Sequence, residues 1–579
     1  MTPLQRRSIA GGLLGALALG TAPASACGGF FCSSTQPVNQ AAERIVFADN
    51  GDGTVTAVIQ ILYQGPSQNF SWVLPISSVP GEDGIGVGSD LAFTRLQALT
   101  NPQYSLTTRI EGQCRNTPTP TAVPGNGNFG AAATGGSSSV APSGTATPPV
   151  TVEASGEVGA FEWTVISLDP NLSEPADAAV AWLEENGYDV SPGSPELLGP
   201  YLADGMYLLA LKLTKGANTG SIRPIRITYE GDKPVIPIKL TAVAANDDMG
   251  VLVWLLGEER GVPFNYYSLE LNEAYINWFS AGTNYGSVVT QAADEAGGQG
   301  FVTEFAGSSD ALKDQIWSPA QEQQWTALQN MTFSSFGELY QAVSAYYGGF
   351  SGFWDALAPA LILPEGVKPE DFKSCPNCYA FELSPSRLFD GLEEHVIEPM
   401  RSMQQLLTSR PVMTRLYTTL SAMEMTEDPL FTFNADLPPV SNVHTAERVI
   451  ECNPSVEQFN APWRIELPQG GVVRGAGSSQ AWPVVPEQPY NRRVLQLGDT
   501  GSGMVAEDHT ARLAEINAPA APRPPSTGGG GSGGEAAPAP ESQDSGCAVS
   551  SPASGRNGAL GLLALSLLAL PLRRRARQR

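Results

Sequence analysis

Two segments of the chain have very few of the residues that build a hydrophobic core, and they limit where folded structure can form. Residues 116–152 carry no charged side chain and consist mainly of Gly, Pro, Ser, Thr and Ala, and residues 516–546 are similarly rich in Pro, Gly, Ala and Ser. Chains of this composition cannot bury enough apolar surface to order themselves. We therefore predict a disordered insert at 116–152, a flexible tether at 516–546, and a folded body over residues 27–515 that the insert interrupts.

The start of the chain has the pattern of a secretory signal peptide. Arg6 and Arg7 form a short basic region, an apolar run follows over residues 9–19, and small residues occupy positions 24–26. This order is typical of a signal that is cut after its small residues. The paired arginines also fit a twin-arginine export route, and Cys27 at the new N-terminus leaves lipidation open. We predict a signal peptide over residues 1–26 and an exported protein.

The end of the chain combines three features in a fixed order. Gly546-Cys547 follows the tether, an apolar segment spans residues 559–572, and a cluster of arginines ends the chain at Arg579. This arrangement resembles the myxobacterial C-terminal sorting tails (the MYXO-CTERM class). The resemblance implies that the tail 547–579 is cleaved and that Cys547 is modified for anchoring at the cell surface. A permanent membrane anchor with cytoplasmic arginines is the alternative. Both predict a protein at the cell surface or outer envelope, held to a membrane by its C-terminal anchor or a lipid.

The charge balance limits the partners. The chain has 58 Asp and Glu against 33 Lys and Arg, which gives a net charge of −25. Binding to nucleic acid needs clustered Lys and Arg, so nucleic acid is excluded as the main partner. The chain has only three histidines, so few residues are candidates for metal ligands or acid–base catalysts. We predict neither a cofactor nor a metal site.

The cysteines indicate disulfides. Seven is an odd number for an exported protein, and setting Cys547 aside for processing leaves six. Six cysteines allow fifteen pairings, among which the sequence does not choose. Proximity favours Cys27–Cys32 and Cys375–Cys378, and leaves Cys114–Cys452, which would join the N-terminal part of the body to its far end.

The hydrophobic pattern predicts an α+β fold with a β-rich N-terminal half, a mainly helical second half and disulfide staples. Alternating apolar residues predict a hairpin over residues 43–64 with its turn at 49–53. Further strands are predicted at 70–75, 161–168, 207–213, 225–229, 236–240 and 251–256. Helices are predicted at 90–99, after Ser173, and from about 272 to 425, where Ser318 and Ser335 begin capping boxes. Residues 440–505 are irregular with some β character.

Several stretches resemble a known family. The opening of the body is similar to that of an exported bacterial family, domain of unknown function 2330, in Cys27-Gly28-Gly29-Phe30-Phe31-Cys32 and Gln40-Ala41-Ala42-Glu43-Arg44-Ile45-Val46-Phe47. Later stretches are similar too, at residues 221–227, 414–418, 428–431 and 440–444. The resemblance spans most of residues 27 to 450. The family has no established activity, so the resemblance implies kinship and no catalytic residue.

Two motifs are candidates for chemistry. Cys375-Pro376-Asn377-Cys378 has the spacing of a redox-active pair, but the residues after it make a poor helix start, which favours a structural disulfide. His444 lies in a family-like stretch and is a candidate base or ligand, although a buried, hydrogen-bonded structural histidine is the simpler interpretation.

Other polar and aromatic groups fit a structural role as well as a binding role. The acidic stretches 49–53 and 246–248 have carboxylates that calcium accepts, but both are more typical of turns between strands. A dense group of aromatic residues between 266 and 354 fits either an exposed glycan or peptide surface or the core of the helical part.

Taken together, these features favour a surface-anchored, non-enzymatic envelope protein with a structural, adhesive or binding role. Its envelope partner or extracellular ligand stays open. The alternative is an exported enzyme, either a thiol oxidoreductase that uses Cys375 and Cys378 or a hydrolase built from distant residues.

Overall fold

The predicted hairpin forms part of the central sheet of the molecule. The computed structural model describes residues 39–518 except 65–70, 82, 116–149, 170, 189, 191–192, 214–221, 232, 244, 478–481 and 484. Strands β1 (Asn39–Asp49) and β2 (Thr54–Gln64) pair antiparallel around a tight turn. Gly51 and Gly53 have φ angles of +69° and +85° in that turn, which only glycine adopts freely. The hairpin prediction is therefore confirmed.

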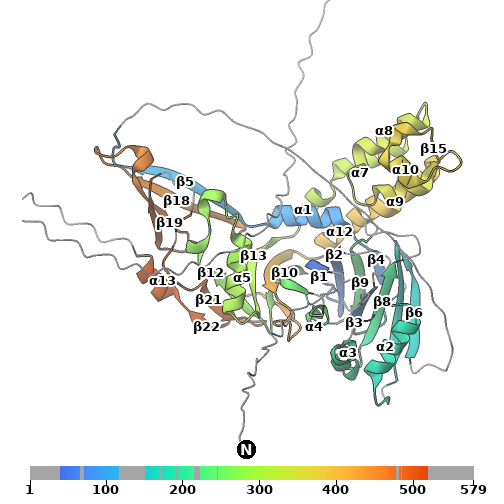
Figure 1. Cartoon of the computed structure of the whole chain (residues 1–579), viewed down its shortest axis with the longest axis horizontal. Coiled ribbons are helices and arrows are strands. Elements are labelled where there is room, and N and C mark those ends of the chain that lie inside the picture. Colours follow the sequence, from blue (N-terminus) through green and yellow to red (C-terminus); the bar gives the residue numbers. More distant parts are fainter. Residues whose placement is uncertain are drawn as a thin grey trace, which may run out of the picture. The chain divides into compact units, whose positions relative to one another are not determined.

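The central sheet has ten strands in the order β22-β21-β12-β13-β16-β10-β1-β2-β9-β4 (Figure 1). Its other members are β4 (Ile85–Val87), β9 (Ile225–Glu230), β10 (Ala245–Gly257), β12 (Tyr267–Leu271), β13 (Gly300–Ser308), β16 (Val412–Leu420), β21 (Asn491–Gln496) and β22 (Met504–Asp508). β1 pairs in parallel with β10, and β16 lies antiparallel between β10 and β13. Strands that are far apart in the sequence are therefore neighbours in the sheet.

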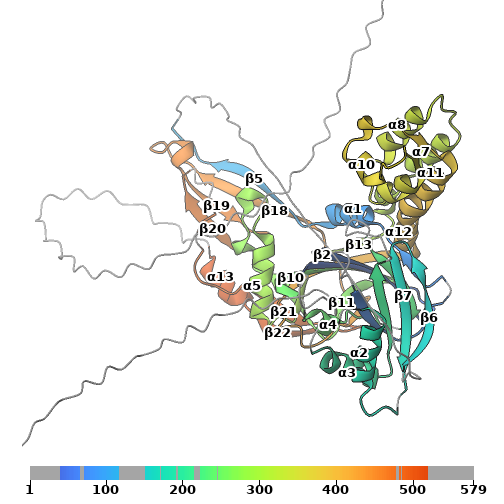
Figure 2. The same cartoon turned by 45° about the vertical axis from the view of Figure 1, so that its right-hand side comes forward.

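A second sheet packs on one face of the first. It contains four strands in the order β3 (Ser71–Ile76), β8 (Tyr207–Leu213), β7 (Phe161–Leu168) and β6 (Val150–Val158). Its inner residues, such as Leu74 and Leu209, share a buried cluster with Ile45 and Phe47 of the central sheet. Helices α2 (Pro175–Glu185) and α3 (Ser194–Ala203) cover its outer face through a separate apolar cluster (Figures 1 and 2).

Helices share a buried apolar cluster with the opposite face of the central sheet. They are α1 (Asp90–Thr100), α6 (Lys313–Ile316), α7 (Pro319–Gln329), α8 (Phe336–Tyr347), α9 (Phe353–Leu357), α10 (Pro369–Ser374), α11 (Pro385–Leu392) and α12 (Glu398–Ser409). Figures 1 and 2 show α7, α8 and α10 gathered together. Trp254 of β10 and Trp325 of α7 belong to the buried cluster that these helices share with the sheet.

A third sheet and several short elements complete the described chain. The third sheet has the order β20 (Val472–Ala476), β19 (Pro462–Glu466), β18 (Val443–Glu451) and β5 (Gln103–Glu111), with β18 and β5 parallel. Two small pairs are β11 (Arg260–Pro263) with β17 (Phe431–Asn434) and β14 (Leu361–Ile362) with β15 (Glu382–Leu383). The remaining α-helices of the described chain are α4 (Ile238–Thr241), α5 (Tyr285–Glu295) and α13 (Thr510–Ile516), and short 3₁₀ and π-helical turns lie between the elements.

The α+β class is confirmed, and most of the helices lie in the second half as predicted, but that half also contributes strands to the central sheet. β13 and β16 lie within the segment predicted to be helical, and β17 to β22 follow it. β13 and β16 lie between helices in the sequence, and the strands that β16 pairs with are more than a hundred residues away.

Three boundaries also differ from the prediction. β6 begins at Val150, inside the predicted insert, while residues 116–149 lie outside the described part. Residues 238–241 form the helical turn α4 instead of a strand. Helix α2 begins after Glu174 without a side-chain cap, so Ser173 does not cap it.

Candidate functional site

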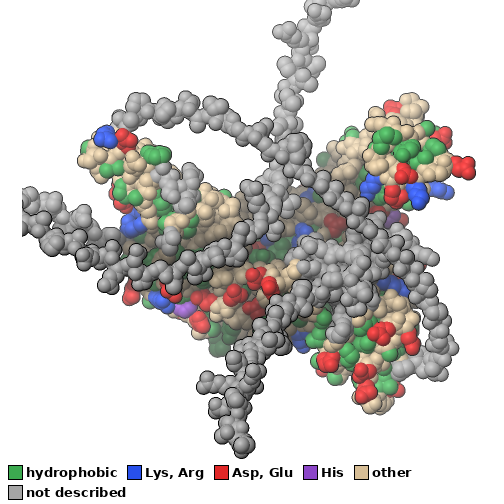
Figure 3. Space-filling view, in the orientation of Figure 1, with side chains coloured by type: hydrophobic (Ala, Val, Ile, Leu, Met, Phe, Trp, Pro, Cys, Tyr) green, Lys and Arg blue, Asp and Glu red, His purple; other side chains and the backbone are tan. Residues whose placement is uncertain are grey.

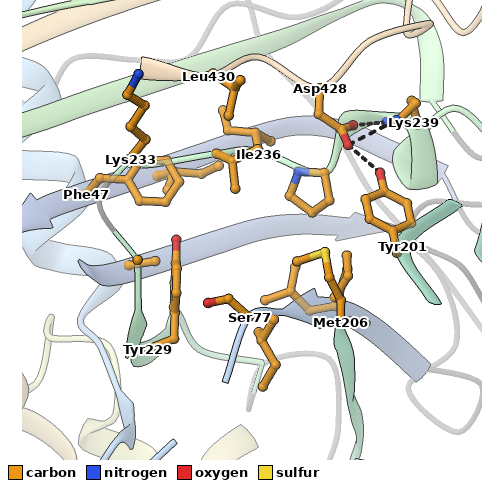
Figure 4. Close-up of a pocket in the computed structure, with 18 of the residues that line it drawn as sticks. Phe47, Ser77, Tyr201, Met206, Tyr229, Lys233, Ile236, Lys239, Asp428 and Leu430 are labelled. Atoms are coloured by element: carbon orange, nitrogen blue, oxygen red, sulfur yellow. Dashed lines mark hydrogen bonds and ion pairs between the residues drawn. The ribbon is translucent and has the colours of Figure 1, made fainter. Parts of the chain in front are cut away.

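A cavity lies between the central sheet and the second sheet. Its volume is about 420 Å³. Its apolar lining includes Ile45, Phe47 and Ile59 of the central sheet, Leu74 and Ile76 of the second sheet, and Ile236 from the segment between β9 and α4. We call it the inter-sheet cavity. Figure 4 shows Phe47, Ile236 and Leu430 facing Tyr229, Ser77 and Met206 across it.

Glu43 is the exceptional residue of this lining. It lies on β1 two residues before Ile45, and alternation along the strand turns it to the same face as Ile45 and Phe47. It is 5% exposed, and its Oε2 atom is buried without a hydrogen-bond partner among the described residues. Burial raises the pKa of Glu43 to about 7, because the carboxylate loses its hydration and gains no compensating charge.

The Asp428 carboxylate, another polar group in the lining, is hydrogen-bonded by protein partners. The Tyr201 hydroxyl donates to Asp428 Oδ2 at 2.6 Å, and the Lys239 backbone N–H donates to Asp428 Oδ1 at 3.0 Å (Figure 4). The Lys239 ammonium lies 3.5 Å from Asp428 Oδ2. Burial, followed by the nearby Asp428, raises the pKa of Tyr201 above its usual range, which keeps the phenol protonated. Asp428 is thus bound by the protein, whereas Glu43 Oε2 is left for another group.

The sequence pattern marks these residues only weakly. An acid at an inward-facing strand position, in line with Ile45 and Phe47, is the signal that points to Glu43. Nothing local connects Glu43 with Asp428, because the two meet only through the packing of distant segments. Both lie in stretches that carry the family resemblance, at residues 40–47 and 428–431.

The structure joins four of the cysteines considered above. Cys114 is bonded to Cys452, just beyond the ends of the parallel strands β5 and β18, and Cys375 is bonded to Cys378. Cys375–Cys378 is one of the two pairings that proximity favours, and Cys114–Cys452 is the pair that those two leave over. Cys27, Cys32 and Cys547 lie outside the described residues, as do the signal peptide and the sorting tail.

The Cys375–Cys378 pair lacks the setting of a redox-active site. Cys375 caps the C-terminal end of α10, and the residues that follow form a short 3₁₀ turn. A thiolate is stabilised at the N-terminus of a helix, whereas the C-terminal end carries partial negative charge. The helix thus gives Cys375 none of the activation that a thiol oxidoreductase needs.

The three histidines are in different environments. His395 lies in the π-helical turn Glu393–Ile397, where burial lowers its pKa, and His509 Nδ1 lies 2.9 Å from the Asn491 carbonyl oxygen. His444 lies on β18, with Nδ1 2.8 Å from Glu273 Oε1, and its side chain is 27% exposed. His444 is hydrogen-bonded as expected, but it lines a second cavity and is not fully buried.

The two acidic stretches take part in backbone structure. Asp49 and Asp52 accept backbone hydrogen bonds from Gly51 and Thr54 within the hairpin turn. Residues 246–248 belong to β10 and do not form a bend between strands. Within the described ranges, no group of three or more His, Cys, Asp and Glu could hold a metal ion.

The aromatic residues do not form one core of the helical part. Tyr266 packs between the two sheets, Trp278 belongs to the cluster beside α5, and Tyr347 and Phe353 belong to the helical cluster. Tyr346 is exposed. Packing therefore distributes these residues over three clusters.

Acidic side chains mark the surface. In the space-filling view they stand out over the part formed by α2 and α3, where Glu184 and Glu185 are exposed (Figure 3).

Among the helices of the described residues, none has both the length and the apolar character needed to cross a membrane.

Comparison with known proteins gives a family and no activity. No curated protein matches the chain. Two solved structures show some similarity, the 3.1 Å and 2.7 Å crystal structures of a mutated baculovirus P35 after caspase cleavage. Both are 11% identical; the matches cover 38% and 40% of this chain and 67% and 76% of the other, with TM-scores of 0.21 and 0.20. TM-scores this low indicate neither the fold nor the function of the chain.

The family match covers the first part of the body. A family model described as "Uncharacterized protein conserved in bacteria (DUF2330)" matches residues 21–316. The match is shorter than the resemblance expected to residue 450, and the stretches at 414–418 and 428–444 lie beyond it. Because it covers half of the chain, the chain belongs to this family of uncharacterized proteins conserved in bacteria.

Proposed function

We propose that the chain is a binding protein that holds a small apolar molecule in the inter-sheet cavity. The observation that carries this proposal is the Glu43 carboxyl, which is buried in an apolar cavity with Oε2 unpartnered among the described residues. A buried polar atom without a partner costs about 1–3 kcal/mol, and a ligand that hydrogen-bonds to it would recover that energy.

The lining indicates the chemistry of the ligand. A volume of about 420 Å³ is within the range of small-molecule sites, about 300–1,000 Å³. The apolar walls favour a hydrocarbon body, and Glu43 favours a ligand group that donates a hydrogen bond, such as an amine or a hydroxyl. A carboxylic acid of the same length would place two acidic groups together and should bind less well.

A displacement assay tests this proposal. The fluorescent amine 1-aminoanthracene is bound to the purified protein and displaced with dodecylamine, dodecanol or dodecanoic acid. We expect the amine and the alcohol to displace the probe better than the acid. Glu43→Gln should weaken dodecylamine binding at least tenfold, which corresponds to about 1.4 kcal/mol. Ala57→Leu, which fills the cavity, should weaken every ligand.

Glu230→Gln is the matched control, because Glu230 is exposed at the end of β9. Thermal unfolding of each variant shows whether the fold is retained. Unchanged binding in folded Glu43→Gln and Ala57→Leu would refute the inter-sheet cavity as the site.

We also propose that the protein acts outside the cell, anchored at the surface through its C-terminal tail. This proposal rests on the signal-like pattern at residues 1–26 and on the order of tether, Gly546-Cys547, apolar segment and arginines. The mass of protein released from the cell surface tests it. We expect a chain that ends near Cys547, and Cys547→Ala should retain the arginines. A surface protein that includes Arg579 would leave only the permanent anchor, and a wholly cytoplasmic protein would refute export.

A further inference from the structure

A second cavity, which we call the His444 cavity, is separate from the inter-sheet cavity. Its volume is about 470 Å³, and the two cavities share no lining residue in the part of the chain that the structure describes. His444 of β18 and Tyr104 of β5 lie on one part of its wall, and Arg260 and Glu273 also line it. It therefore combines a histidine, a carboxyl group and a guanidinium around one space.

Glu273 and Tyr104 fix the position of the His444 ring. Nδ1 lies 2.8 Å from Glu273 Oε1, and the ring stacks on Tyr104 with centroids 4.7 Å apart and planes at 21°. Glu273 is 3% exposed, and its backbone oxygen accepts a hydrogen bond from Trp278 Nε1 at 3.2 Å. The carboxylate is thus buried and its backbone is tied to the protein core.

This contact determines which ring nitrogen is free to react. A carboxylate accepts hydrogen bonds. The proton of the neutral His444 ring therefore lies on Nδ1, and this N–H donates a hydrogen bond to Glu273 Oε1. Nε2 then has a free lone pair, and the described residues place no hydrogen-bond partner on it. A histidine oriented by a carboxylate, with the other nitrogen free, is the arrangement of a general base.

Arg260 supplies a positive charge that forms no ion pair with a carboxylate among the described residues, although Glu270 is near enough to act on that charge. Its two terminal nitrogens donate to the Pro438 carbonyl and the Thr303 hydroxyl at 3.0 and 3.2 Å, and its buried Nε has no partner among the described residues. Arg492 and Arg493, which also line the cavity, are both bound to Glu270. Arg260 is therefore the cation best placed to hold an anionic group of a ligand.

We propose that the His444 cavity hydrolyses a carboxylic ester that bears a negatively charged group. Arg260 binds the anionic group, and His444 Nε2 takes a proton from water as the water oxygen attacks the ester carbonyl carbon. The bond between that carbon and the alcohol oxygen then breaks. The proton passes from Nε2 to the leaving oxygen, so the products are a carboxylic acid and an alcohol.

The strength of the catalytic group decides in favour of an ester. General base catalysis contributes about 10²- to 10⁴-fold, which suits an ester but is small against the barrier of an amide. Among the described residues no serine, threonine or cysteine is bonded to Nε2, so water is the nucleophile. Glu273 is a positioning residue, because it acts through His444.

Release of p-nitrophenolate tests the proposal with the full chain. The substrates are mono-p-nitrophenyl succinate, which is anionic, and p-nitrophenyl acetate, which is neutral. We expect hydrolysis above the buffer rate, with a higher kcat/KM for the anionic ester. His444→Gln should lower kcat/KM at least 100-fold. Arg260→Gln should raise KM for the anionic ester more than it raises KM for the neutral ester.

Two further comparisons separate catalysis from folding. His509→Gln is the matched control, since the chain has three histidines and His509 does not line this cavity. Glu273→Gln should lower kcat and shift its pH profile, and Glu273→Asp should restore part of the activity. If the wild type is no faster than buffer, or if His444→Gln equals His509→Gln, the proposal is wrong. Thermal unfolding confirms that each variant is folded.

Discussion

The buried acid Glu43 should make the stability of the protein depend on pH in a way that one substitution removes. Its pKa is raised from about 4.5 to about 7 in the folded state, while in the unfolded chain it returns to its ordinary value. Between these two values the folded state keeps a proton that the unfolded state has lost. Stability must then fall as pH rises, by about 1.4 kcal/mol per pH unit. Over the whole interval the loss is about 3 kcal/mol.

The measurement is urea unfolding of the wild type and of Glu43→Gln from pH 4 to pH 8, followed by tryptophan fluorescence. Other titrating groups contribute equally to both proteins, so the difference in unfolding free energy isolates Glu43. We expect the wild type to lose about 3 kcal/mol relative to Glu43→Gln across this range. The difference between the wild type and the exposed control Glu230→Gln should change by less than about 0.5 kcal/mol. Parallel curves for the wild type and Glu43→Gln would refute the argument that Glu43 is a buried, unpaired acid.

Three further predictions concern stability. Arg415 Nε lies 2.5 Å from Glu304 Oε2 in a buried pair, so Arg415→Met should destabilise the fold by about 3–5 kcal/mol in thermal unfolding, and a loss below 1 kcal/mol would contradict this. Cys114→Ser should lower the free energy of unfolding in urea by about 2–5 kcal/mol, because its disulfide joins residues 338 apart in the sequence. Cys375→Ser should lower it much less, because that disulfide joins residues only 3 apart. Equal losses would argue against loop closure as the cause. Ser318→Ala removes the capping box of α7 and should cost about 1 kcal/mol, and no measurable change in the unfolding midpoint would oppose that role.

Local patterns in the sequence predict local structure well. The alternation around the hairpin, the strand at 161–168 and the helix beginning at Asp90 all correspond to observed elements. The capping box at Ser318 is present: the Ser318 hydroxyl accepts a hydrogen bond from the Gln321 backbone N–H, and the Gln321 side chain accepts one from the Ser318 backbone N–H. Ser335 accepts from the Glu338 backbone, but the Glu338 carboxylate turns to Ser334 instead, so that second box is incomplete. These features depend on residues within one or two helical turns, which a sequence pattern contains.

Both sites depend on information that local patterns lack. The order of the central sheet places β16 beside strands that lie more than a hundred residues earlier, and no periodicity encodes that pairing. Glu43 becomes a buried acid only because a second sheet covers its face. His444 and Glu273 are 171 residues apart in the sequence, and only the packing of β18 beside the segment after β12 brings them together.

Because β16 lies between β10 and β13, the segment that matches the family model is not expected to fold on its own. The family match ends at residue 316, whereas β16 spans Val412–Leu420. A chain cut at residue 316 would keep β10 and β13 but lose the strand that pairs with both. It would thus split the central sheet and leave backbone N–H and C=O groups unpaired along two exposed edges. Such edges recruit strands from other molecules, so the matched segment alone should aggregate. The smallest autonomous unit of this protein must therefore extend at least through residue 420, well past the region by which its relatives are recognised.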